Sequence, residues 1–332
     1  MPVIYKEFIN SYEILHLNDS ELWQKPVITE KQIFDNIYIN KLLPYNYIAF
    51  PWASYIDNKW TKQYNETEKI IDDLINDKLL IDNSKTYFTV VQHIEFRNYI
   101  EKFKKLNIQY IFTPHKINSD YELENKYNIS IIPISLFPKQ NNKYNYCQQP
   151  KKKIYLVSFM GQIIHKNNIS DIRNKMFECL KNKPNCFLKC NDKWFYEKHV
   201  YGNNNDKIKE NNKLQENDEI YIKTINDSVF SLCPSGTGPN SIRLWESISF
   251  GSIPVILSND LILPIINKDI DYRNYFVLWK EENIDTLYDY LLTIDNKTKK
   301  QMSKNCFRLY NDYFCELNMH KPILYYFSEK KI

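Results

Sequence analysis

Three of the five glycines in this 332-residue chain lie within sixteen residues, from Gly236 to Gly251. Average glycine usage of about 7% would place about 23 glycines in a chain of this length. A chain this poor in glycine is expected to keep it where the backbone requires it, in a left-handed turn or against a close neighbour. The segment around these glycines is therefore where the sequence most constrains the fold.

That segment reads DSVFSLCPSGTGPNSIRLWESISFGSIPVILS. Its pattern predicts a strand over 229–233, a loop over 234–239, a helix over 240–250 and a second strand over 253–257. Gly251 stands where a glycine commonly ends a helix. A strand that runs through a glycine-containing loop into a helix exposes backbone N–H groups at the positive end of the helix dipole. The segment therefore predicts an anion site.

Two charged residues of the predicted helix fit such a site. Arg243 lies just inside the helix and offers a planar guanidinium that binds phosphate through two hydrogen bonds. Glu246 follows three positions later, on a similar side of the helix, and its carboxylate is a suitable acceptor for ribose hydroxyls. An ordinary βαβ turn with an Arg–Glu surface pair fits the same spacing, so both interpretations stay open at this point. The loop has neither GxGxxG nor GxxxxGK[ST], so neither a dinucleotide-dependent dehydrogenase nor a P-loop NTPase follows.

The whole chain alternates short apolar runs with amphipathic stretches, which is typical of an α/β protein with mostly parallel sheets. The polar, basic stretch 138–153 is the best candidate for a linker. We expect a first Rossmann-like domain over 1–150, a second over 151–310, and a C-terminal helix within 311–332 that could return to the first domain. Residues 203–217 are polar and predict an exposed loop.

Composition narrows the class of protein. Lys and Arg exceed Asp and Glu by 44 − 40 = 4, too small an excess for a protein that binds nucleic acid by charge alone. No apolar run is long enough to span a bilayer, and no signal peptide is visible. Seven cysteines without a CxxC pair favour a reducing compartment, so we expect a cytoplasmic protein. The basic run 151–153 leaves a peripheral contact with an anionic membrane open.

The segment around the glycines also resembles the signature of a known protein family. The phrase FSLCPSGTGPNSIRLWESISFGSIPVILS closely resembles the C-terminal signature of the exostosin-type glycosyltransferases. YLVSFMG followed by SDIRNKM is similar to an earlier strand and Arg-bearing helix of that family, and TVVQHIEFR and IFTPHK resemble its first domain. The resemblance is strong over 227–263, moderate over 154–176 and weak elsewhere.

The resemblance implies a GT-B fold, in which two Rossmann-like domains face each other across a cleft. It also implies an inverting transfer of a sugar from a nucleotide sugar, usually a UDP-sugar, to a glycan hydroxyl, with no cofactor and no essential metal. By the same resemblance Arg243 would hold the diphosphate, Glu246 the nucleoside, and Arg173 would be a second cation beside the phosphates. The remaining donor-site residues would form the loop under the donor: Ser235, Gly236, Thr237, Gly238, Asn240 and Ser241. Some members have a basic loop here, so this chain brings fewer cations to the phosphates.

An inverting transfer needs a base that takes the proton from the acceptor hydroxyl. We expect this base near the carboxyl ends of the strands of the first domain. His93 follows a predicted strand and is the favoured site residue, and Asp57 is the next choice for the base. His115 and Glu95 are further candidates, and each of the four could instead have a structural role.

The sequence gives little indication of a metal site. The pair Asp269 and Asp271 has the spacing of a metal–nucleotide motif, but it lies beyond the donor segment in a polar stretch, where a chance pair of carboxylates is the preferred explanation. No cluster of His and Cys has the spacing of zinc ligands. Three alternatives to transfer stay open: a sugar-nucleotide hydrolase or phosphorylase, an inactive nucleotide- or glycan-binding module, and a scaffold in a polysaccharide-assembly complex.

Overall fold

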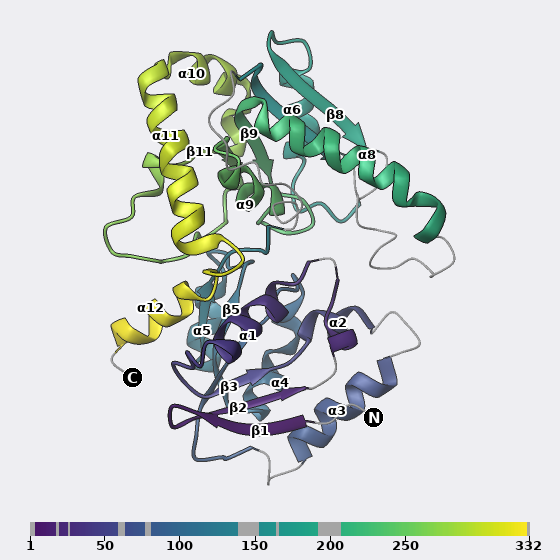
Figure 1. Cartoon of the computed structure of the whole chain (residues 1–332), viewed down its shortest axis with the longest axis vertical. Coiled ribbons are helices and arrows are strands. Elements are labelled where there is room, and N and C mark those ends of the chain that lie inside the picture. Colours follow the sequence, from purple (N-terminus) through teal and green to yellow (C-terminus); the bar gives the residue numbers. More distant parts are fainter. Residues whose placement is uncertain are drawn as a thin grey trace. The chain divides into compact units, whose positions relative to one another are not determined.

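The computed structural model describes residues 4–17, 20–25, 27–58, 64–76, 81–138, 153–163, 166–191 and 207–330. The chain divides into two compact units (Figure 1). Unit 1 comprises residues 1–136, 261–268 and 316–332, and unit 2 comprises residues 137–260 and 269–315. Each unit has its own largely parallel sheet covered by helices. The predicted GT-B fold class, with two Rossmann-like α/β units in one chain, is confirmed, whereas the cleft stays a prediction.

The described part of unit 1 forms a six-stranded sheet in the order β1-β2-β3-β4-β5-β6. β1 and β2 pair antiparallel, and the other neighbours pair parallel. The strands are rich in β-branched and aromatic residues and are largely buried, as expected for a parallel sheet covered on both faces. The elements are β1 (Ile4–Ile9), β2 (Tyr12–Leu17), η1 (Ser20–Leu22), α1 (Thr29–Ile39), β3 (Tyr47–Ala49), α2 (Trp52–Asn58), α3 (Tyr64–Asn76), β4 (Tyr87–Val90), η2 (Phe96–Tyr99), α4 (Ile100–Lys105), β5 (Ile108–Thr113), α5 (Asp120–Tyr127), β6 (Ser130–Pro133) and α12 (Lys321–Lys330).

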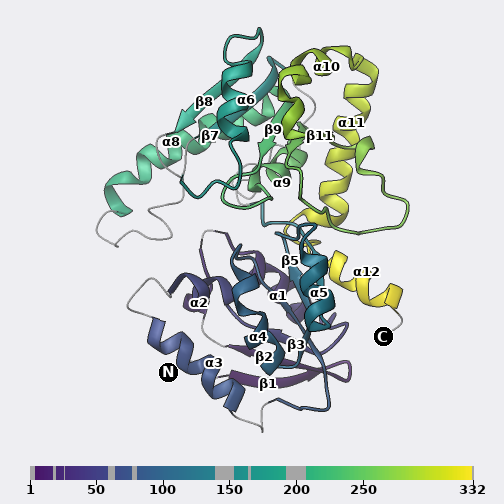
Figure 2. The ribbon, with the colours of Figure 1, turned by 180° about the vertical axis from the view of Figure 1, so that it is seen from behind.

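The C-terminal helix α12 belongs to unit 1 (Figure 2), where aromatic side chains hold it on the sheet. The ring of Phe327 stacks on Tyr45 with centroids 5.1 Å apart and lies 5.3 Å from Tyr110 and 5.8 Å from Phe112. Phe327 is itself buried. Burial of side chains of this size contributes about 1.5–3 kcal/mol each, which is what keeps so distant a part of the chain on the sheet.

The unit boundaries differ from the predicted 150 and 310 in three places: unit 2 already begins at residue 137, and two later segments change units. Residues 261–268, predicted for the second domain, belong to unit 1 because the main-chain N–H of Ile262 donates to the carbonyl of Lys116 at 3.1 Å. Residues 311–315 belong to unit 2, where Phe314 packs on Trp245 with ring centroids 4.6 Å apart. The chain therefore returns to unit 1 at residue 316, a few residues later than predicted.

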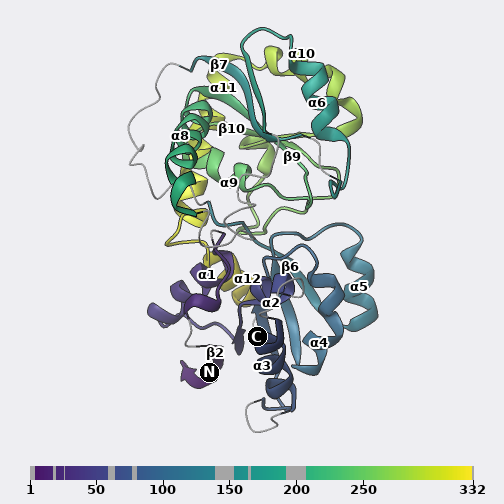
Figure 3. The ribbon, with the colours of Figure 1, turned by 90° about the vertical axis from the view of Figure 1, so that its right-hand side faces the viewer.

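In the described part of unit 2, the sheet has five parallel strands in the order β11-β10-β9-β7-β8. Figure 3 shows α6 and α8 on opposite sides of β7 and β9. The core is built by alternate apolar residues of the strands and by α6, α10 and α11. The elements are β7 (Tyr155–Gln162), α6 (Ile172–Leu180), β8 (Cys186–Asn191), α8 (Lys207–Asn226), β9 (Ser228–Pro234), α9 (Ile242–Ser249), β10 (Ile253–Leu257), η5 (Tyr272–Asn274), β11 (Val277–Trp279), η6 (Glu281–Thr286), α10 (Leu287–Thr293), α11 (Asn296–Leu309) and η7 (Tyr310–Phe314).

The predicted exposed loop over 203–217 is wrong where the structure describes it, because α8 begins at Lys207. Lys, Glu, Gln and Asn dominate this stretch, and no apolar stripe marks one face. Further along the same helix, Ile222 and Ile225 are buried. Among the described helices, none is long and apolar enough to cross a membrane.

Gly251 adopts the left-handed conformation that its position after α9 predicts, with φ of 61°. A left-handed conformation costs a non-glycine residue about 1–2 kcal/mol, and a Cβ here would lie 3.0 Å from Ser303 Oγ. We therefore expect Gly251→Ala to lower the free energy of unfolding by about that amount, measured by urea titration. Asn128→Gly, at an exposed left-handed position after α5, is the control and should not destabilise the protein. An unchanged urea midpoint for Gly251→Ala would contradict the expectation.

Candidate functional site

The sheet of unit 2 reverses its strand order between β7 and β9. From β7 the chain runs outward to β8, and it then returns through α8 to β9 on the other side of β7. Such a switch point separates the loops that leave the two neighbouring strands, and ligands of α/β proteins bind at the carboxyl ends of the strands there. The glycine-containing loop after β9 and the segment that leads from β7 to α6 meet at this point.

Arg173, in the first turn of α6, joins the ends of the two strands. Its Nε donates to the carbonyl of Ser235 at 2.8 Å, and its Nη1 donates to the carbonyl of Gln162 at 2.7 Å. Burial lowers the pKa of Arg173 to about 10, and the positive charge of Arg243 acts in the same direction. The side chain is half-buried. Two guanidinium groups thus lie near one another at the switch point, an arrangement that a bound anion would stabilise.

At Gly236 of this loop there is no room for a side chain. A Cβ at Gly236 would lie 2.9 Å from Arg173 Cζ and would overlap Nη2. Its main-chain N–H donates to the carbonyl of Gly238 at 2.9 Å, which closes a tight turn. Among the described glycines, Gly251 is the one with positive φ, so Gly236 serves close approach rather than a left-handed backbone. The predicted need for glycine at 236 therefore has a physical cause, the guanidinium of Arg173.

Arg243 lies on α9 deeper in the unit, with 8% of its surface exposed. Its guanidinium stacks over Phe159, with Cζ 4.4 Å from the ring centroid. Its Nη2 donates to the carbonyl of Met160, and its Nη1 lies 3.5 Å from the carbonyl of Leu232. In this conformation Arg243 ties β7 to β9 with the terminal nitrogens that the sequence analysis assigned to the diphosphate.

Glu246 is almost fully buried, with 1% of its surface exposed. Tyr221 of α8 donates its hydroxyl hydrogen to Glu246 Oε2 at 2.6 Å, and its ring lies 5.4 Å from Arg243 Cζ. Tyr221 therefore contacts both charged residues of the predicted donor site. Nothing in the sequence pattern pointed to it, because strand order alone brings α8 against α9.

The other loop residues differ in accessibility. Ser235 is buried, and its hydroxyl donates to Glu281 Oε1 at 3.0 Å and lies 3.1 Å from the hydroxyl of Ser170. Asn240 Oδ1 accepts a hydrogen bond from Trp245 Nε1 at 3.1 Å. Thr237 is exposed and Ser241 occupies the N-cap position of α9. Ser235 and Asn240 thus hold the loop in place, and Thr237 is the side chain of the loop most open to a ligand.

In unit 1, the structure brings together two residues that are thirty-six positions apart in the sequence, Asp57 and His93. His93 Nε2 lies 3.0 Å from Asp57 Oδ1. The main-chain N–H of Glu95 donates to His93 Nδ1 at 3.1 Å, so Nδ1 is the acceptor and Nε2 carries the hydrogen that points to Asp57. Both nitrogens of His93 are engaged. The pair lies beyond the carboxyl ends of β3 and β4, as the sequence analysis predicted.

Three polar residues beside this pair were missed from the sequence: Gln24, Glu30 and Gln92. Gln24 Nε2 donates to Asp57 Oδ2. Glu30 is 2% exposed, and burial raises its pKa to about 8 against the opposing effect of the backbone N–H groups of Gln92, Ala53 and Trp52. None of the three has a spacing signal, because they come from separate loops and helices.

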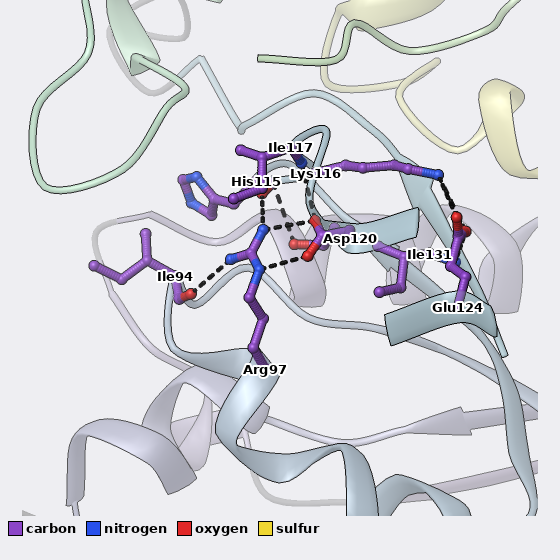
Figure 4. Close-up of polar contacts among 9 residues, drawn as sticks. Ile94, Arg97, His115, Lys116, Ile117, Asp120, Glu124 and Ile131 are labelled. Carbon is purple, nitrogen blue, oxygen red and sulfur yellow. Dashed lines mark hydrogen bonds and ion pairs between the residues drawn. The ribbon is translucent and has the colours of Figure 1, made fainter. Parts of the chain in front are cut away.

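Arg97 organises the loops after β4 and β5 (Figure 4). Its guanidinium forms a bidentate ion pair with Asp120, with Nε–Oδ1 and Nη2–Oδ2 distances of 2.6 Å. Nη2 also donates to the carbonyl of His115 at 2.6 Å, and Nη1 donates to the carbonyl of Ile94 at 3.2 Å. One partly buried ion pair thus fixes the segments that carry His93 and His115. Glu95 contributes its main-chain N–H to the same arrangement.

The imidazole of His115 is buried, and its Nδ1 has no hydrogen-bond partner within the described ranges. Burial lowers the pKa of His115 to about 3, and Arg97 and His93 act in the same direction. A base must exchange a proton near neutral pH, and this ring is a neutral group in the interior. Of the four candidates, His115 is therefore the least suited to the role of base.

This burial predicts a pH dependence of stability. Below pH 6.5 the unfolded chain protonates His115 while the folded chain does not until near pH 3, so stability falls as the pH decreases through that window. At pH 5 the loss is about 2 kcal/mol. Urea titrations at pH 5 and 7.5 should show a smaller loss for His115→Gln than for the parent. Glu30 titrates with the opposite sign in both proteins, so the difference between them isolates His115, and equal losses would contradict the prediction.

Asp271 is explained by a local turn. Its Oδ1 accepts from the main-chain N–H of Arg273 at 3.0 Å, and Oδ2 pairs with Arg273 Nη2 at 2.8 Å. Across the described residues, no group of three or more His, Cys, Asp or Glu side chains could hold a metal ion. A role for Asp269 and Asp271 in metal binding gains no support from this geometry.

The amino-acid sequence is similar to a glycosyltransferase family and to plant proteins. A family model of the exostosin GT47 domain matches residues 87–322, more than two thirds of the chain. A probable glucuronosyltransferase of Oryza sativa subsp. japonica is 39% identical over 89 residues, which cover 26% of this chain and 20% of the relative. A probable β-1,4-xylosyltransferase of Arabidopsis thaliana is 36% identical over 78 residues, 24% of this chain and 18% of the relative. The matched stretches therefore span about a fifth of the length of these relatives.

Solved structures are similar at lower identity. The S. aureus protein TarM, in complex with fondaparinux, α-GlcNAc-glycerol and UDP, is 14% identical, with coverage of 73% of this chain and 50% of that chain and a TM-score of 0.43. A glycosyltransferase from Rickettsia africae is 12% identical, with coverage of 94% and 83% and a TM-score of 0.43.

Proposed function

Because the chain belongs to the exostosin GT47 family of glycosyltransferases, we propose that it transfers a sugar from a nucleotide sugar, in the first place a UDP-sugar, to a hydroxyl of a glycan with inversion at the anomeric carbon. The observation that carries the proposal is the switch point of unit 2, where Arg173, Arg243 and the loop after β9 surround the carboxyl ends of β7 and β9. Two arginines and a helix N-terminus at such a point suit a diphosphate.

The two arginines have different roles in this proposal. Arg173 is half-buried beside Gly236, so it is the guanidinium that reaches the diphosphate. Arg243 makes no direct contact with the diphosphate in this proposal. It adds a second positive charge close to Arg173, and its hydrogen bond to the carbonyl of Met160 holds the end of β7 in place. The diphosphate role that the sequence assigned to Arg243 is thus shared, with the direct contact moved to Arg173.

Glu246 is proposed to bind the nucleoside. Its carboxylate accepts from Tyr221, and a carboxylate is also the kind of acceptor that ribose hydroxyls bind. Since Glu246 is 1% exposed, ribose binding requires a shift of Tyr221 or of α8. In the loop before α9, Thr237 is exposed and Ser241 is half-buried.

The departing nucleoside diphosphate develops negative charge, which something must stabilise. We propose that the two guanidinium groups and the N-terminus of α9 do so without a metal ion. Preorganised donors of this kind are effective because they need no rearrangement during the reaction. On this proposal, chelation of divalent metals leaves turnover unchanged.

Unit 1 is proposed to supply the base. His93 has both ring nitrogens in hydrogen bonds, and its Nε2–H points to Asp57. The carboxylate of Asp57 is therefore the better acceptor for the proton of the sugar hydroxyl, and His93 orients it. From the sequence alone, His93 is the favoured site residue and Asp57 the next choice for the base; we propose the reverse order, with Asp57 as the base and His93 as the residue that orients it.

The experiment that tests the function is turnover of nucleotide sugars with and without a glycan acceptor, in the presence of EDTA. The names of the relatives include glucuronosyl and xylosyl transfer, so UDP-glucuronic acid and UDP-xylose lead the donor panel. Release of UDP that requires the acceptor supports a transferase. Equal release without acceptor indicates a hydrolase, and UDP binding without any turnover indicates a binding module. Loss of turnover in EDTA would contradict a metal-independent reaction.

A further inference from the structure

The side-chain amide of Gln92 is buried and uses both its oxygen and its nitrogen. Its Oε1 accepts from the main-chain N–H of Glu30 at 3.1 Å. Its Nε2 donates to the carbonyl of Val27 at 2.7 Å and to Gln24 Oε1 at 2.8 Å. These three hydrogen bonds leave the amide one orientation, because a flipped amide would place its oxygen against two acceptors and its nitrogen against a donor.

The orientation of Gln92 determines that of Gln24. Since Gln24 Oε1 accepts from Gln92, the nitrogen of Gln24 faces Asp57, and it donates to Asp57 Oδ2. Asp57 Oδ1 faces the Nε2–H of His93. Each carboxylate oxygen thus faces an N–H group of a side chain that is itself fixed.

The main chain of the same residues fixes the helix that carries Asp57. Glu30 Oε1 accepts from the main-chain N–H of Gln92 at 2.8 Å and from that of Ala53 at 3.1 Å. Ala53 is the second residue of α2, and Asp57 lies one turn further along that helix. One carboxyl group therefore ties the start of α2 to the end of β4.

We propose that Gln24 and Gln92 are positioning residues for Asp57, which they hold as a proton acceptor in one orientation through a relay of side-chain amides. This proposal rests on the proposed function, in which Asp57 is the base. A displacement of about 1 Å in a reacting group costs up to a hundredfold in rate. Because neither glutamine belongs to the predicted donor site in unit 2, their loss is expected to lower kcat and to leave the KM for the nucleotide sugar unchanged.

The test is steady-state transfer by Gln24→Leu, Gln92→Leu and the double variant. We expect kcat to fall roughly ten- to a hundredfold in each, with the donor KM unchanged. The double variant should be no slower than the worse single variant, because both residues act through one hydrogen bond. Gln32→Leu is the control, since Gln32 is also a buried glutamine of unit 1, bonded to Asn36 at 3.1 Å. It should transfer at the parental rate.

Gln92→Leu removes three hydrogen bonds of a buried side chain and could fail to fold, so Gln24→Leu, at a half-buried position, decides the matter. A parental kcat for Gln24→Leu, in a protein whose Asp57→Asn variant is inactive, would overturn the positioning role alone. A change in donor KM with unchanged kcat would overturn it as well. A parent that turns over no nucleotide sugar would instead overturn the proposed function and this proposal with it.

Discussion

Asp57→Asn is expected to lower the transfer rate by roughly 10²–10⁴-fold, the usual contribution of a general base. The amide keeps the size of the side chain but has lost the basic oxygen that takes the proton of the acceptor. Because Asp57 lies in unit 1 and the predicted phosphate-binding residues lie in unit 2, the affinity for UDP should not change. Steady-state rates and calorimetric titration of UDP, measured on the same preparation, check both parts.

Two further variants sharpen this prediction. Asp73→Asn removes an exposed carboxylate from α3 and should transfer at the parental rate. His93→Ala removes the orienting N–H but leaves the carboxylate, so its loss should be smaller than that of Asp57→Asn. If His93→Ala were inactive and Asp57→Asn active, the base would be His93 and the geometric argument would be wrong.

Gly236→Ala is expected to weaken UDP binding by roughly ten- to a hundredfold while the melting temperature changes little. The added Cβ would overlap the guanidinium of Arg173, which is the end of a flexible side chain. It moves aside and exchanges its hydrogen bonds to the carbonyls of Ser235 and Gln162 for hydrogen bonds to water, at a small net cost to folding. The displaced guanidinium loses a charge-assisted hydrogen bond to the diphosphate, which is worth about 1.5–3 kcal/mol. Calorimetric titration of UDP gives the affinity, and a thermal melt gives the stability.

The controls use the same loop. Arg173→Lys keeps the charge but loses the planar fork, so it should weaken UDP binding in the same direction. Gly238→Ala, for which neither a positive φ nor contact with Arg173 is found, should bind UDP more tightly than Gly236→Ala. Parental affinity in both Gly236→Ala and Arg173→Lys would show that Arg173 only joins β7 to β9.

Local pattern predicts the elements whose own residues decide their structure. The strand over 253–257 has the predicted bounds because five apolar residues stand between two turn signals, and Gly251 has the predicted left-handed conformation. The helix α8 could not be predicted in this way. Its first half lacks an apolar face, and the contacts of its second half with β7 and β9 depend on strand order.

In the candidate sites too, the sequence predicts residue types but not how tertiary contacts orient the side chains. The residue types at Arg173, Arg243, Asp57 and His93 are recognisable from the sequence, but their orientations are not. Arg243 turns its guanidinium onto Phe159 and the carbonyl of Met160, because β7 ends beside α9. The glutamines that hold Asp57 carry no motif, since tertiary contacts alone bring their separate segments together.

The central claim is that the donor diphosphate binds at the switch point of unit 2, and hydrogen exchange of the main-chain amides with and without UDP tests it most directly. With saturating UDP and EDTA, we predict slower exchange in residues 235–243, at the loop after β9 and the start of α9, and no change in the sheet of unit 1. Protection that leaves out residues 235–243, or that appears only when a divalent metal is added, would contradict the claim.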